Sequence, residues 1–105
     1  MDDRGRMDML ARMQETLERY LDCVAERANP LWRVSAASFV TDLETMARAV
    51  ADRELQGAVS ELKAIPLTAV EFEVKRTGRG RVERASKAVS DLVFQLQGEL
   101  LDRAL

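Results

Sequence analysis

The residues best suited to chemistry in this sequence are the basic side chains clustered between positions 75 and 87. The segment has six basic residues and one acid, so it carries a net charge of about +5 in a chain whose formal net charge is −2. The basic residues are Lys75, Arg76, Arg79, Arg81, Arg84 and Lys87. Such a cluster can bind a phosphate backbone or an acidic protein surface. The candidate partner-binding residues of this segment are Arg76, Arg79, Arg81 and Arg84.

Two observations weigh against nucleic acid as the partner of this segment. The rest of the chain carries about −7 and would repel phosphates. No aromatic residue interleaves the arginines, so base stacking is not expected. A structural interpretation stays open, in which the arginines pair with acids on neighbouring helices or subunits. Gly78 and Gly80 offer little apolar packing, so we expect Arg79 and Arg81 to be exposed.

The sequence holds few of the groups that catalysis needs. It has no histidine, and Cys23 is its only cysteine, so neither a Cys–His nucleophile nor a His-based metal site is expected. Ser60 and Lys63 match a spacing used by some serine enzymes, but four residues are a weak signal and read as an exposed helix face. We expect no catalytic residue, no metal and no cofactor. A minor alternative is a small all-helical enzyme that gathers Arg27 or Arg53 with a carboxylate.

Apolar residues recur every three or four positions in three stretches, which is the spacing of a helix with one buried face. The pattern predicts helices over about 7–28, from about residue 36 onward, and over about 82–104. The three sets are Leu10, Met13, Leu17, Leu21, Val24 and Ala28; Phe39, Leu43, Met46 and Val50; and Val82, Ala85, Val89, Leu92, Leu96 and Leu100.

The first two helices are expected to form an antiparallel hairpin. Asn29 and Pro30 end the first helix, and the connection that follows is short, with Ser35 a suitable N-cap for the second helix. Trp32 is expected to plug the end of this hairpin. The apolar pattern slips after Val50, which predicts either a kink or the start of a new short helix.

The segment 67–81 has two interpretations. Residues 70–75 alternate apolar and charged side chains, as a strand does. The same residues fit a helix, because Thr68 and Glu71 have capping-box spacing and Leu67 and Phe72 occupy hydrophobic-staple positions. We favour the helix and keep a short strand at 70–75 as the alternative. Residues 77–81 are expected to form a Gly/Arg joint before the last helix.

Together these patterns predict one all-α domain over 1–105, a small bundle built from a helical hairpin and one or two further helices. Residues 1–6 are expected to be frayed. Phe94 and Leu101 widen the apolar face of the last helix beyond what one neighbour covers, which suggests a homo-oligomer or a partner-binding site. The acidic start and the short apolar runs predict neither signal peptide nor membrane span, hence a cytoplasmic protein.

The function expected from this reading is a non-enzymatic protein–protein interaction module. An adaptor, an assembly chaperone, a small subunit and an inhibitor of a larger complex all fit, because each needs only a shaped helical surface. The alternative is a nucleic-acid-binding regulator that uses the segment 75–87.

Overall fold

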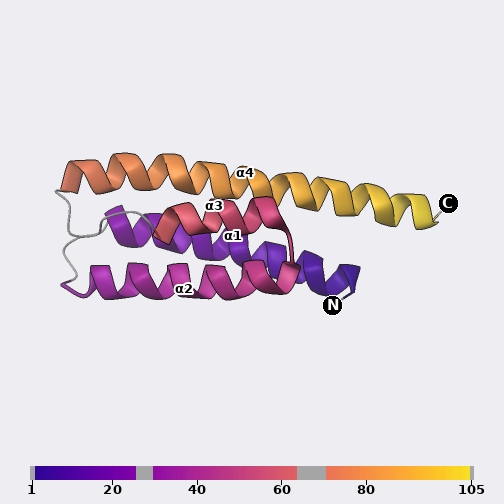
Figure 1. Ribbon diagram of the computed structural model, residues 1–105, viewed down its shortest axis with the longest axis horizontal. Helices are drawn as coiled ribbons and strands as arrows, with labels where there is room; N and C mark the ends of the chain where they lie inside the picture. Colours follow the sequence, from indigo (N-terminus) through magenta and orange to yellow (C-terminus); the bar gives the residue numbers. More distant parts are fainter. Residues whose placement is uncertain (1, 26–29, 64–70, 105) are drawn as a thin grey trace.

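A computed structural model describes residues 2–25, 30–63 and 71–104 and shows an all-α bundle of four helices in the described residues. The helices are α1 (Asp3–Ala25), α2 (Trp32–Val50), α3 (Arg53–Lys63) and α4 (Glu71–Ala104). Successive helices run in opposite directions, and each packs on two others: α1 on α2 and α4, and α3 on α2 and α4 (Figure 1). The predicted all-α class and the predicted antiparallel hairpin of α1 and α2 are confirmed.

The core follows the predicted helical spacing on every helix. Each helix places side chains three or four positions apart on one buried face, and these faces meet along the bundle axis. The buried residues of α1 and α2 include Leu10, Met13, Leu17, Tyr20, Val24, Trp32, Ala36, Val40, Leu43, Ala47 and Val50. Those of α3 and α4 include Leu55, Ala58, Val59, Leu62, Val82, Ala85, Val89 and Leu96.

The slip in the apolar pattern after Val50 marks a true break between two helices. Ala51 adopts the left-handed conformation with φ of 60°, and its N–H donates to the carbonyls of Ala47 and Arg48. Asp52 then caps α3, because its carboxylate accepts a hydrogen bond of 2.9 Å from the backbone N–H of Leu55. Of the two predicted alternatives, the new short helix is therefore the one that forms.

Both helices of the hairpin begin earlier than predicted. Asp2 caps α1 by accepting a 2.8 Å hydrogen bond from the Gly5 N–H, so the first helix starts at Asp3 instead of following a frayed segment 1–6. Ser35 is not an N-cap, because α2 starts at Trp32 and the Ser35 N–H donates to the Leu31 carbonyl. Trp32 is buried, as expected for a residue that plugs the end of the hairpin.

The Gly/Arg joint predicted at 77–81 does not form, because α4 runs unbroken through Gly78 and Gly80. Each glycine costs a helix about 1 kcal/mol relative to alanine, and burial of the helix face that follows offsets this cost. Residues 71–75 also belong to α4 and are not a strand, while residues 64–70 lie outside the described residues. The favoured helical interpretation of this segment is confirmed from Glu71 onward.

The lengths of α3 and α4 differ greatly, and this sets the shape of the molecule. A helix of 34 residues spans about 51 Å, which matches the longest extent of 52 Å. The 11 residues of α3 cover only part of it. The C-terminal end of α4 consequently projects beyond the other helices (Figure 1).

Candidate interaction surface on helix α4

The arginines of the predicted basic segment do not share one environment. The Arg84 guanidinium forms an ion pair with the Glu61 carboxylate, and Arg81 donates a hydrogen bond to the Glu61 backbone carbonyl. Arg79 is exposed and lies 4.0 Å from Glu83 on its own helix. The expectation of an exposed side chain is thus confirmed for Arg79 but wrong for Arg81, which is half-buried against α3. Arg76 lies in α4, and its side chain is outside the described set.

These contacts favour the structural interpretation for two of the arginines. Arg81 and Arg84 connect α4 to the C-terminal half of α3, because both guanidinium groups contact Glu61 of that helix. The sequence left this structural interpretation open but could not assign it to particular arginines, because its pattern predicted a joint at 77–81. Once the segment is helical, Arg81 and Arg84 are three positions apart and share one face.

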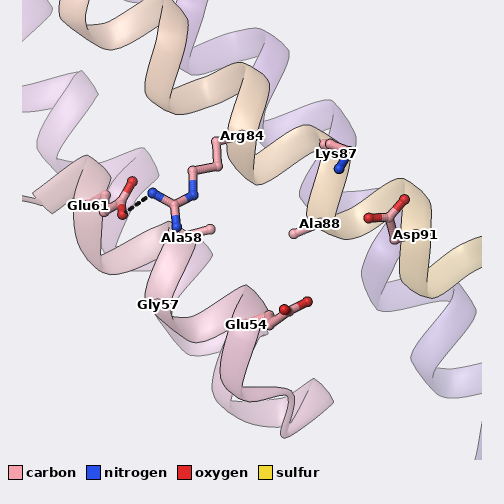
Figure 2. A pocket seen from close by; sticks show the side chains of 8 residues that line it. All are labelled: Glu54, Gly57, Ala58, Glu61, Arg84, Lys87, Ala88 and Asp91. Carbon is pink, nitrogen blue, oxygen red and sulfur yellow. Dashed lines mark hydrogen bonds and ion pairs between the residues drawn. The ribbon is translucent and has the colours of Figure 1, made fainter.

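A groove of about 320 Å³ runs between α3 and α4. Its walls are formed by Glu54, Gly57, Ala58 and Glu61 of α3 and by Arg84, Lys87, Ala88 and Asp91 of α4. Figure 2 shows the Glu61–Arg84 pair toward one end of the groove and Glu54 toward the other, nearer Asp91. Small side chains leave the middle open, because Gly57, Ala58 and Ala88 project little into it.

The groove was not predicted from the sequence. The available signal was the pair of small residues at Gly57 and Ala58, but their meaning depends on which helix faces them. Within the described part of the chain, Lys87, Asp91 and Glu54 have no ion-pair partner. The groove therefore has unpaired side chains of both charges, one basic and two acidic, and an uncharged middle.

Phe94 and Leu101 lie in the last three turns of α4, beyond the groove that α4 forms with α3, and both are strongly exposed, at 80% and 66%. They are seven residues apart, so they share one side of the helix. Leu96, on another side, is buried at 2% against the core. The structure therefore confirms the predicted surplus of apolar face on the last helix. A homo-oligomer or a partner-binding site at this face stays a prediction.

The exposed face is continuous with the groove. Lys87, Phe94 and Leu101 follow one another at seven-residue spacing, and Asp91 and Gly98 fall between them on the same side. Beyond Asp91 this side of α4 is uncovered, because α3 begins only at Arg53, next to the groove residue Glu54. Gln97, Gly98, Glu99, Leu101 and Asp102 are all exposed. We call residues 94–104 the α4 overhang.

A second pair of exposed apolar side chains lies near the start of α2. Leu31 is 62% exposed and Val34 is 68% exposed. The Arg33 guanidinium lies 5.2 Å from the centre of the Trp32 ring. Sequence reasoning missed this pair because it assigned these residues to a connection. The pair serves below as a matched control for the overhang.

The half-buried Cys23 thiol on α1 does not resemble a catalytic nucleophile. Burial raises the pKa of the Cys23 thiol, while a backbone hydrogen bond from Ala36 lowers it in part. The thiol itself donates to the Trp32 carbonyl at 3.1 Å. A raised pKa keeps the sulfur protonated, which is the opposite of an activated nucleophile.

The remaining catalytic candidates among the described residues are Lys63, Ser60 and Arg53. Lys63 Nζ lies 3.6 Å from a Glu44 carboxylate oxygen, and Ser60 is exposed. Arg53 is exposed, and Arg27 lies outside the described residues. Over residues 2–25, 30–63 and 71–104, no cluster of three potential metal ligands occurs.

No family model, curated protein or solved structure matches this chain. No helix among the described residues has the length and apolar character needed to cross a membrane.

Proposed function

We propose that this protein is a non-enzymatic protein–protein interaction module that works through the overhang of α4. It would act as an adaptor, an assembly chaperone, a small subunit or an inhibitor of a larger complex. The observation that carries the proposal is the 80% exposure of Phe94 on a part of α4 that α3 does not cover. An aromatic side chain held in water on a rigid helix is typical of a binding anchor.

Burial of this face would supply part of the free energy of binding. Burying a Phe or Leu side chain fully contributes roughly 1.5–3 kcal/mol, so Phe94 and Leu101 together supply a substantial part of a micromolar affinity, which needs about 8.2 kcal/mol. The helix already holds both side chains in a fixed relation. Little conformational entropy is then lost on binding.

The test is quantitative capture of partners from the native host by three forms of the protein. The wild type and a control variant, Leu31→Ser with Val34→Ser, should retain the same partners in equal amounts. The variant Phe94→Ser with Leu101→Ser should lose them, while its circular dichroism stays helical. Equal capture by all three forms would place the functional surface elsewhere.

The alternative of a nucleic-acid-binding regulator has less support. Arg81 and Arg84 are engaged with Glu61, so part of the basic segment is already neutralised within the chain. Fluorescence anisotropy with duplex DNA and single-stranded RNA tests it directly. Binding that falls steeply with salt and weakens in Arg79→Glu would favour this alternative over the protein–protein one.

A further inference from the structure

We infer that the overhang of α4 docks into the α3–α4 groove of a second copy of the same chain. Two copies then exchange overhangs around a two-fold axis near residue 93. This inference rests on the proposed function and names the partner of its surface. Four features of the described residues support it: an overhang long enough for the groove, small facing residues, an unpaired lysine that faces an acid, and the uncovered continuation of one helix face.

The overhang is long enough to fill the groove. Residues 94–104 form roughly three helical turns, and the groove runs from Glu54 to Glu61 of α3, about two turns. The overhang of one copy can therefore lie along the whole groove of the other. The body of the second copy then extends away from the first, because the two antiparallel α4 helices run in opposite directions from the crossing near residue 93.

Small residues on both sides allow two helices to come close. The groove contributes Gly57, Ala58 and Ala88 to its middle. The overhang contributes Gly98, where an added Cβ would meet nothing within 4 Å in the single chain. In an antiparallel arrangement centred near residue 93, Gly98 of one copy lies level with Lys87 and Ala88 of the other.

One charge pair is complementary in this arrangement. Glu99 is exposed on the overhang, and Lys87 on the α4 wall of the groove has no ion-pair partner among the described residues. Antiparallel docking brings Glu99 level with Lys87 and Asp102 level with Arg84, which already pairs with Glu61. The acidic end of the groove, at Glu54 and Asp91, faces the uncharged start of the overhang around Phe94.

The two-fold symmetry explains why one chain carries both surfaces. Each contact of the overhang with the groove occurs twice, so modest surfaces add up to a closed interface. A parallel arrangement would instead place like overhangs side by side and leave both grooves empty. The antiparallel arrangement covers Phe94, Leu101 and the groove in one step.

A disulfide trap tests both the partner and the direction of docking. In a Cys23→Ala background, Lys87→Cys and Gly98→Cys are introduced together and singly. The two positions are about 16 Å apart along one helix, far beyond the 4.4–6.8 Å between Cα atoms that a disulfide allows, so a bond between them can form only across two chains. Mild oxidation should convert most of the double variant to covalent dimer, at least about fivefold more than either single variant.

Sedimentation velocity over a wide range of protein concentrations measures dimerisation without a covalent bond between the chains. The wild type and the Leu31→Ser, Val34→Ser control should form dimers, and Phe94→Ser should weaken dimerisation by at least about tenfold. Strong cross-linking of the single-cysteine variants would overturn the antiparallel arrangement. A wild type that stays monomeric and unlinked would overturn the second copy as partner, and capture from the host would still decide the proposed function on its own.

Discussion

Two parts of α4 both carry apolar side chains at helical spacing but have opposite surroundings. From Arg79 to Asp91 the helix packs on α1 and α3, Arg81 and Arg84 contact Glu61, and every apolar stripe residue is at least half-buried. In the overhang, Phe94 and Leu101 face water. The difference arises from α3, which starts at Arg53 and leaves the last three turns of α4 without that neighbour. A helix face is therefore made into core or into a binding surface by the length of the element beside it.

The sharpest test of this comparison uses two leucines of the same helix. Leu96→Ala should lower the free energy of unfolding by roughly 2–5 kcal/mol, because it leaves a cavity at a site that is 2% exposed. Leu101→Ala should cost under about 0.5 kcal/mol at low protein concentration, where mass action favours the monomer. Urea unfolding of both variants checks this. Similar losses would mean that the overhang is covered within one chain.

The arginines provide a second matched pair. Arg81→Glu should destabilise the fold by roughly 1–3 kcal/mol, because it removes a donor to the Glu61 carbonyl and places a carboxylate beside it. Arg79→Glu should change stability by less than about 0.5 kcal/mol, since Arg79 is exposed. Thermal melts of the two variants separate them. An Arg79 variant as unstable as the Arg81 variant would contradict the assignment of Arg81 as the structural arginine.

The cap of α3 fixes where the covered half ends. Asp52→Ala should cost about 1 kcal/mol, because the Leu55 N–H then lacks its acceptor. Hydrogen exchange should rise in the first turn of α3 and in α4 around Asp91, while the overhang stays unchanged. Exchange that rises evenly along α4 would show that the boundary does not depend on this cap.

The smallest expected effect concerns Tyr20, which is buried on α1 and whose pKa is sensitive to Arg81. Burial, followed by the charge of Cys23, raises the Tyr20 pKa above 10.0, while Arg81 lowers it in part. The folded state therefore holds this proton more tightly than the unfolded state, and stability falls as pH rises through this range. Tyr20→Phe should remove the part of that alkaline loss that Tyr20 contributes, while the part from Cys23 remains.

At neutral pH the same substitution should change stability by less than about 1 kcal/mol. The Tyr20 hydroxyl is buried without a hydrogen-bond partner among the described residues, so removing it breaks no such contact. Denaturant melts between neutral and strongly alkaline pH measure both effects. A large loss at neutral pH would reveal a partner for the hydroxyl.

The sequence was most informative where its pattern was repetitive. The spacing of Leu10, Met13 and Leu17, and of Val82, Ala85 and Val89, predicted the buried faces because a helix must hide its apolar side from water. It was least informative at Gly78 and Gly80, where local preference favoured a joint. There the burial of Val82 and the contacts of Arg81 with α3 outweighed a cost of about 1 kcal/mol per glycine.

By itself the sequence determined the helical class, the hairpin of the first two helices and the excess apolar width at Phe94 and Leu101. These follow from local periodicity, which any short window of the chain contains. Only the tertiary structure decided that Arg81 and Arg84 contact Glu61, that Gly57 and Ala88 line a groove, and that α4 extends past α3. Such facts depend on which helix faces which and on where each helix ends relative to its neighbour, and both are set by packing between segments that are far apart in the chain.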